Sequence, residues 1–83
     1  MKILWFAWFR TRVGKAEEEL QLPASVGDVA GLLEFLRARS PGHAAALRDL
    51  SVVRVAVNQE YVPFHHPVRD GDEVALFPPV TGG

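Results

Sequence analysis

The C-terminal end of the sequence, from Phe77 onward, holds the residues whose types and order could support chemistry. Pro78 and Pro79 cannot donate hydrogen bonds to a sheet, so the chain must leave any sheet there, and they stiffen its exit toward a polyproline conformation. Gly82 and Gly83 have no Cβ atom, so they can pass through a narrow channel. When extended, the residues from Pro78 onward reach at most about 20 Å, far enough to carry a terminal carboxyl group into another protein. The alternative is an ordinary frayed chain end, because most termini are mobile.

Side chains elsewhere offer little for catalysis or metal binding. The sequence has no cysteine, which excludes disulfides, thiol catalysis and thiolate metal sites. His65 and His66 are adjacent, so in an extended segment their side chains point in opposite directions, and we interpret them as part of a surface loop. The acidic run at 17–19 is interpreted as the solvated end of a strand. Without a nucleophile motif or a glycine-rich phosphate loop, the folded body is not expected to be an enzyme on its own, and no metal site is predicted.

Length and charge limit the range of functions. The 83 residues amount to one small domain, and a hydrophobic content of 48% permits a packed core. The formal net charge of −1 gives no reason to expect nucleic acid or an anionic membrane as partner. Arg10, Arg12 and Lys15 form a small basic cluster that could contact an acidic partner, although we interpret them as a solvated loop. The apolar run at 3–9 is too short to span a bilayer and no cleavage site follows it, so we expect a soluble, cytoplasmic protein.

The N-terminal part of the sequence predicts two strands. Residues 2–9 are β-branched and aromatic, which is typical of a strand that is covered at least partly on both sides. Residues 10–15 begin polar and end at glycine and lysine, which indicates a loop or hairpin turn. Residues 17–22 begin charged and end in an alternation of leucine and glutamine, which predicts a second strand.

One amphipathic helix is predicted after Pro23. Ser25 stands three residues before Asp28, a pattern similar to the capping box at a helix start. An apolar stripe with helical spacing follows, and its members are Val29, Leu32, Leu33 and Leu36. Residues 40–42, a Ser-Pro-Gly sequence, are expected to end this helix because the residue before proline disfavours the α region. Residues 44–50 are predicted to form a shorter second helix.

The C-terminal part predicts further strands. Alternating valines indicate a strand at residues 51–57, residues 61–62 add a short strand, and a turn rich in aspartate and glycine precedes the last strand, 73–77. Strands around one main helix predict an α+β fold of the β-grasp type. In that fold the helix packs on one face of a mixed sheet, and the first and last long strands are neighbours. The folded body then comprises residues 1–77, and residues 78–83 form an extended tail.

Several segments resemble one protein family. Residues 70–83, with the sequence Asp-Gly-Asp-Glu-Val-Ala-Leu-Phe-Pro-Pro-Val-Thr-Gly-Gly, closely resemble the C-terminus of the small subunit of molybdopterin synthase, the MoaD-type sulfur carriers. Residues 57–59, the pair His66-Pro67 and the opening segment 2–13 also look like that family. The resemblance covers essentially the whole chain, and the C-terminal motif is its most specific part.

The resemblance implies a ubiquitin-like β-grasp fold and a sulfur-carrying role for Gly83. An adenylyltransferase related to ubiquitin-activating enzymes would use ATP to convert this glycine to an acyl adenylate, and sulfur from a sulfurtransferase would then replace AMP to give a thiocarboxylate. The chain itself would hold no permanent cofactor. Its tail would enter the large subunit of a heterotetramer, where sulfur goes to cyclic pyranopterin monophosphate to form the dithiolene of molybdopterin. The residues expected in this insertion are Pro78, Pro79, Val80, Thr81 and Gly82.

Strand alternation predicts a docking surface at the root of the tail. If Val74 and Leu76 face the core, Phe77 lies outside, and the same alternation in the first strand places Phe6 outside. Tyr61 would join them on the open face of the sheet. We predict that Phe6, Tyr61 and Phe77 dock the large subunit, with burial in the core as the alternative.

Three other functions are consistent with the sequence. A thiamine-pathway sulfur carrier would share the fold and the Gly-Gly end, although the Phe-Pro-Pro segment at 77–79 favours the molybdopterin family. A ubiquitin-like protein modifier would use the same terminal carboxyl group to form isopeptide bonds. A non-covalent β-grasp binding module would leave the tail idle.

Overall fold

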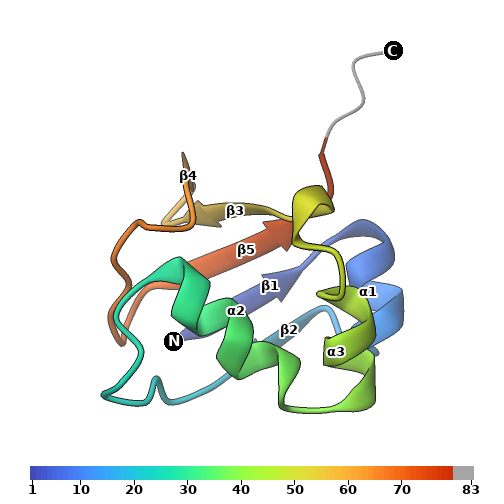
Figure 1. Ribbon diagram of the computed structural model, residues 1–83, viewed down its shortest axis with the longest axis horizontal. Helices are drawn as coiled ribbons and strands as arrows, with labels where there is room; N and C mark the ends of the chain where they lie inside the picture. Colours follow the sequence, from blue (N-terminus) through green and yellow to red (C-terminus); the bar gives the residue numbers. More distant parts are fainter. Residues whose placement is uncertain (80–83) are drawn as a thin grey trace.

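The computed structural model describes residues 1–79, which form a five-stranded sheet with α2 lying across one of its faces (Figure 1). The strands follow the order β2-β1-β5-β3-β4 across the sheet. In chain order the elements are β1 (Lys2–Trp5), α1 (Ala7–Val13), β2 (Glu17–Glu19), α2 (Val29–Arg37), α3 (Pro41–Ala46), a 3₁₀ turn (Leu50–Val52), β3 (Arg54–Val57), β4 (Glu60–Val62) and β5 (Glu73–Phe77). None of the helices in this described part is long and apolar enough to cross a membrane.

Strand β5 occupies the centre of the sheet. It runs parallel to β1, with Ile3 paired to Val74 and Trp5 to Leu76, and antiparallel to β3 on its other side. The sheet is therefore mixed and its first and last long strands are neighbours, as predicted. Because β1 and β5 are parallel, the chain leaves β5 at the same end of the sheet where β1 leads into α1 (Figure 1).

Helix α2 is the main helix that the apolar stripe predicted. All four stripe residues, Val29, Leu32, Leu33 and Leu36, are fully buried against the sheet. Burying side chains of this size contributes roughly 1.5–3 kcal/mol each. The helix begins at the Asp28 cap, whose Oδ1 accepts a hydrogen bond from the Gly31 N–H at 2.8 Å. The predicted capping role of Ser25 is therefore wrong, because the carboxylate next to the first turn takes that place.

The predicted strand 2–9 and the predicted loop 10–15 are both corrected by the structure. The strand ends at Trp5, and α1 begins at Ala7, whose φ of 54° lies in the left-handed region and breaks the extended run. The helix turns the Phe9 side chain fully into the core. It ends at Gly14, where a φ of 90° lets the Gly14 N–H donate to the Arg10 carbonyl oxygen at 2.8 Å.

Helix α3 begins where the sequence predicted only the end of the preceding helix. Ser40 is its N-cap, and its Oγ accepts the His43 N–H at 3.1 Å, while Pro41 takes the first position, where no backbone donor is needed. Gly42 faces α1 at very close range, since a Cβ atom there would collide with the backbone carbonyl oxygen of Arg12. This close approach joins α1 and α3 into one unit at the end of the sheet.

The C-terminal strands follow the prediction more closely. Strand β3 is shorter than predicted because the residues before Arg54 form the 3₁₀ turn. Asn58 and Gln59, with φ of 50° and 71°, make the tight turn to β4, a conformation that asparagine tolerates well. Strand β5 has the predicted bounds, and Gly71 supplies the positive φ of 95° in the turn before it.

Candidate functional site

The root of the tail lies directly after the central strand. Strand β5 ends at Phe77, and the half-buried Pro78 and Pro79 carry the chain out of the sheet. The remaining residues of the predicted tail, Val80–Thr81–Gly82 and the predicted reactive Gly83, lie outside the residues that the structure describes. Their roles, and the boundary between body and tail, stay predictions.

The sheet has a covered face and an open face. On the covered face, which packs against the helices, Val74 and Leu76 of β5 are fully buried together with Ile3 and Trp5 of β1. The alternate residues of these strands point to the opposite, open face, where β5 contributes the half-buried Phe77. Phe77 therefore lies outside the core, as the strand alternation predicted.

Two of the predicted docking residues are in contact on the open face. The rings of Tyr61 and Phe77 lie with their centroids 5.2 Å apart, and Tyr61 is 81% exposed. They come from β4 and β5, which flank β3 on either side. Between these strands, Ala56 of β3 pairs with both Tyr61 and Ala75. The open face next to the aromatic pair therefore carries small side chains.

Phe6 lies at the same end of the sheet. It is extended, with φ of −116° and ψ of 156°, so its side chain points away from the buried Trp5 and is 44% exposed. Its N–H donates to the Leu76 carbonyl oxygen at 3.1 Å, which continues the parallel ladder and places Phe6 next to Phe77. The three predicted docking residues thus gather at the tail root, while their role in docking stays a prediction.

A groove opens beside this aromatic pair, between the 3₁₀ turn, the start of β3, the end of β4 and the end of β5. Its volume is about 570 Å³, and its lining is mostly apolar. Residues that line it include Leu50, Tyr61, Val62, Phe64, Phe77 and Pro79. The tail root is therefore one wall of a concave apolar surface, the kind of shape that holds a side chain from a partner protein.

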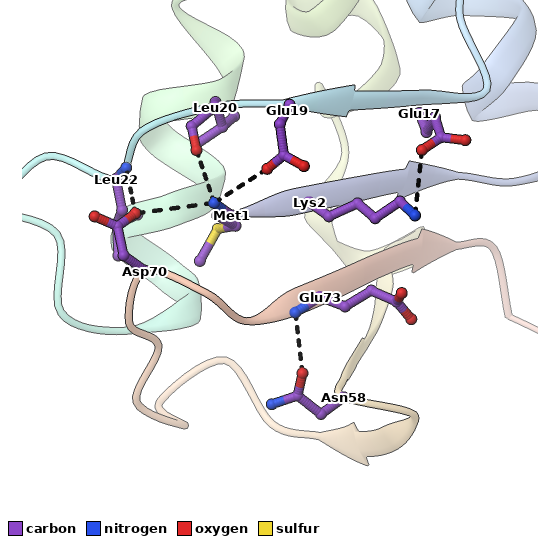
Figure 2. Close-up of polar contacts among 9 residues, drawn as sticks. All are labelled: Met1, Lys2, Glu17, Glu19, Leu20, Leu22, Asn58, Asp70 and Glu73. Carbon is purple, nitrogen blue, oxygen red and sulfur yellow. Dashed lines mark hydrogen bonds and ion pairs between the residues drawn. The ribbon is translucent and has the colours of Figure 1, made fainter.

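Polar contacts close the opposite end of the sheet (Figure 2). The amino nitrogen of Met1 donates to the Leu20 carbonyl oxygen at 2.8 Å and lies 3.4 Å from a Glu19 carboxylate oxygen and 3.9 Å from Asp70. Asp70 also accepts the Leu22 N–H at 2.8 Å, which ties the turn before β5 to the chain after β2. Figure 2 also shows the 3.4 Å ion pair of Lys2 with Glu17 and the hydrogen bond from the Glu73 N–H to Asn58. This end of the sheet is held by ion pairs and charged hydrogen bonds, whereas the groove at the tail root has a mostly apolar lining.

A buried polar cluster on the covered face was not predicted. Glu18 was interpreted as part of a solvated strand end, which is wrong, because its side chain is buried between β1 and α3. Its Oε2 accepts the Trp5 indole N–H at 2.7 Å and lies 2.7 Å from His43 Nε2. Burial raises the pKa of the Glu18 carboxyl, but the hydrogen bonds from His43 and Trp5 and the nearby charges of His43 and Lys15 bring it below its ordinary value. The one local indication in the sequence was that alternate residues of a strand point to opposite faces, so Glu18 of β2 points to the face opposite that of Glu17 and Glu19.

This cluster contains the residue types of a nucleophilic triad. Ser40 Oγ lies 2.7 Å from His43 Nδ1, and the other ring nitrogen contacts Glu18. However, the same Ser40 oxygen accepts the backbone N–H of His43 as the cap of α3, and the Trp5 indole N–H also donates to the Glu18 carboxylate. We therefore assign the cluster to the fold, where it fastens α3 to β1 and β2.

The paired histidines lie in the loop after β4. His65 is exposed, and His66 is half-buried with its Nδ1 2.8 Å from the Pro67 carbonyl oxygen. Within residues 1–79 no three histidine, aspartate or glutamate side chains gather in a way that could hold a metal ion.

Comparisons with known proteins agree on one family. The model of the ThiS family matches residues 3–83. The chain is 45% identical over 83 residues to the molybdopterin synthase sulfur carrier subunit of Escherichia coli (strain K12), a match that covers 100% of this chain and 99% of that protein. A solved structure from Pyrococcus furiosus, assigned as molybdopterin converting factor, subunit 1, superposes with a TM-score of 0.78 at 36% identity and covers 95% of both chains.

A further solved structure shows the same fold in a complex. It is the protein–protein complex of subunits 1 and 2 of molybdopterin-converting factor from Helicobacter pylori, which matches with a TM-score of 0.63 at 23% identity. The match covers 99% of this chain and 96% of that one, and at this identity it concerns the fold alone. Together these structures confirm the predicted β-grasp architecture.

Proposed function

The chain belongs to the ThiS family and to the molybdopterin synthase sulfur carrier subunits, and from this premise we propose that it is the small, sulfur-carrying subunit of molybdopterin synthase. The observation that carries the proposal is the 45% identity to the Escherichia coli carrier subunit over the full 83 residues. Likeness to a named carrier along the whole chain favours this function over the thiamine-pathway carrier and over an idle binding module.

The chemistry centres on the α-carboxylate of Gly83. A carboxylate is a poor acyl donor because its oxygen leaves badly, so a partner adenylyltransferase joins it to the AMP part of ATP and releases pyrophosphate. Sulfur delivered by a sulfurtransferase then displaces AMP and leaves a thiocarboxylate. ATP is bound by the partner in this scheme, which leaves the small subunit without a cofactor of its own.

The large subunit of molybdopterin synthase is the partner that receives the charged tail. Insertion of residues 78–83 brings the thiocarboxylate to cyclic pyranopterin monophosphate and keeps water away from the acyl group. The catalytic side chains belong to the large subunit in this scheme. The described residues contribute the docking surface, since Phe6, Tyr61 and Phe77 present apolar area around the root of the inserted tail.

Removal of Gly83 tests the proposal most directly. The deletion moves the carboxyl group back by about 3.3–3.6 Å, and a misplacement of about 1 Å can reduce acyl transfer on the order of 10²-fold, so single-turnover molybdopterin formation should be abolished. The melting temperature and the affinity for the large subunit should stay unchanged, because the docking surface is intact. Gly27→Ala, which adds a methyl group where no atom lies within 4 Å, serves as the control with normal activity.

Intact mass gives the complementary test. After incubation with the adenylyltransferase, ATP and a sulfur donor, the mass of the full chain should show the exchange of one oxygen atom for sulfur. The deletion variant, treated in the same way, should not form molybdopterin in the single-turnover assay. Conjugates on lysines of other proteins would instead support a protein modifier, and an unchanged mass would support an idle tail. Near-normal product formation by the deletion variant would overturn the proposal.

A further inference from the structure

Helix α1 carries an aromatic–cation pair that is partly open to solvent. Trp8 is 39% exposed, and the Arg12 guanidinium lies over its ring at 5.5 Å from the ring centroid. The two residues are four positions apart in the helix, so they share one side of it. The Trp8 ring also packs on the ring of the fully buried Phe9, with the two centroids 4.1 Å apart, and the rest of the indole is open to solvent. We call the exposed pair the Trp8–Arg12 face.

The face is held in a fixed position. Gly42 of α3 lies so close to the backbone of Arg12 that no side chain fits between the two helices. At the other end of α1, Ala7 has a φ of 54°, a left-handed conformation that a non-glycine residue adopts only when its surroundings impose it. A preorganised surface loses little conformational freedom on binding, which favours its use as an interface.

The face stands next to the tail root. Phe6, which immediately precedes α1, donates its N–H to Leu76 and so anchors the start of the helix beside the end of β5. Figure 1 shows α1 at the end of the sheet from which the chain leaves β5. The Trp8–Arg12 face therefore begins two residues after Phe6, at the same end of the sheet as the predicted docking residues.

The charge of the face indicates the chemistry of its partner. Arg10 and Arg12 are both exposed, no acidic residue stands in the first turn of α1, and within residues 1–79 neither guanidinium pairs with a carboxylate within 4.0 Å. The whole chain has a net charge of −1, so this basic surface is local. A nucleic acid would need a longer row of cations, whereas one carboxylate beside an apolar side chain matches a guanidinium stacked on an indole.

We propose that the Trp8–Arg12 face is a second contact surface for the large subunit of molybdopterin synthase, where it binds an acidic side chain flanked by an apolar one. The proposal rests on the function proposed above and adds to it the residues and the partner chemistry on the α1 side of the tail. Tryptophan and arginine are the residue types most enriched among energetically dominant interface positions. The exposed indole would pack on the apolar side chain and hold the guanidinium toward the carboxylate.

Calorimetric titration with the purified large subunit tests this assignment. Trp8→Ala and Arg12→Glu should each raise the dissociation constant about tenfold, since truncating an interface anchor or reversing its charge costs at least that factor. Arg12→Gln should reduce the dependence of affinity on salt concentration, because one charge pair is lost. Arg69→Glu is the matched control, since Arg69 is also exposed but precedes β5 at the far end of the sheet, and the affinity of this variant should change less than about threefold.

The outcomes separate this proposal from the one on which it rests. If the wild-type chain binds the large subunit and both Trp8→Ala and Arg12→Glu bind as tightly, the Trp8–Arg12 face is not part of the interface and the inference is overturned. An equal loss of affinity in Arg69→Glu would also overturn it, because the effect would then follow net charge alone. If the wild-type chain itself does not bind, the proposed function fails. Circular dichroism of each variant confirms that α1 is still folded.

Discussion

The two faces of the sheet use the same strands for opposite purposes. In β5, Val74 and Leu76 are fully buried under the helices, whereas Phe77 on the other face is left partly open to solvent. The covered face even buries a carboxylate, Glu18, whose Oε2 is held by Trp5 and His43 while Arg39 pairs with its Oε1 at 3.4 Å. The open face does the reverse and leaves large aromatic side chains partly or mostly exposed, with Phe6 at 44% and Tyr61 at 81%. The difference teaches that burial on one face maintains the fold, whereas the exposed aromatic side chains on the other face contribute little to the core and are free for the docking role proposed above.

The largest effect is expected from shortening a side chain on the covered face. Leu76→Ala should lower the free energy of unfolding by about 2–5 kcal/mol, because it removes a fully buried side chain and leaves a cavity under α2. Urea denaturation followed by circular dichroism measures the loss. Affinity of the folded fraction for the large subunit should change little, and a stability equal to that of the wild type would contradict the role given to this face.

The neighbouring residue should show the opposite pattern. Phe77→Glu should weaken binding to the large subunit by about 2 kcal/mol, or roughly 30-fold, because it places a charge at the centre of the apolar docking surface. The free energy of unfolding should change by less than about 1 kcal/mol, since the side chain is only half-buried. Calorimetric titration and urea denaturation of the same preparation give both numbers. Unchanged affinity would remove Phe77 from the interface.

The smallest effect concerns the carboxylate of the covered face. The pKa of Glu18 lies below its ordinary value of 4.5, so its contribution to stability is fully present above pH 4.5 and is lost as the pH falls through the lower, folded-state value. Glu18→Gln, which keeps an oxygen acceptor but cannot titrate, should therefore lose less stability on acidification than the wild type. Unfolding free energies between neutral and acidic pH measure this difference.

A neighbouring glutamate provides the control for that measurement. Glu17 belongs to the same strand but is exposed on the other face, where it pairs with Lys2. Glu17→Gln should retain the acid dependence of the wild type. If both variants show that dependence unchanged, Glu18 does not govern the acid response.

The strands and the main helix were predictable because their sequences contain local patterns. The apolar stripe of α2 fixes its buried side, and the proline pair after Phe77 fixes the end of β5. Helix α1 was missed because its first residues continue an apolar run typical of a strand, and because Phe6 at its N-cap offers no side-chain cap. The strand ends at the left-handed backbone of Ala7, and the C-terminal end of the helix packs closely on Gly42, neither of which a short window of sequence contains.

The candidate site was predictable in part for the same reason. Alternation within β5 and β1 placed Phe77 and Phe6 outside the core, but the contact between Tyr61 and Phe77 depends on the order of the strands. The inward position of Glu18 depends on His43, which lies far away in the sequence and reaches it only after α3 has packed. The stacking of Arg12 on Trp8 required a helix where a loop had been predicted.

The central position of β5 also governs how the chain folds. Ile3 and Val74 lie near opposite ends of the sequence, yet they pair side by side, so closing the sheet requires nearly the whole chain to come together. Such high contact order slows folding relative to a helical bundle of equal length. No fragment that stops before Glu73 could complete the sheet, because β1 and β3 would each lack the neighbouring strand with which they pair. The strand that leads into the tail is thus also the strand that completes the fold, and a partner that recognises the open face would distinguish finished chains from truncated ones.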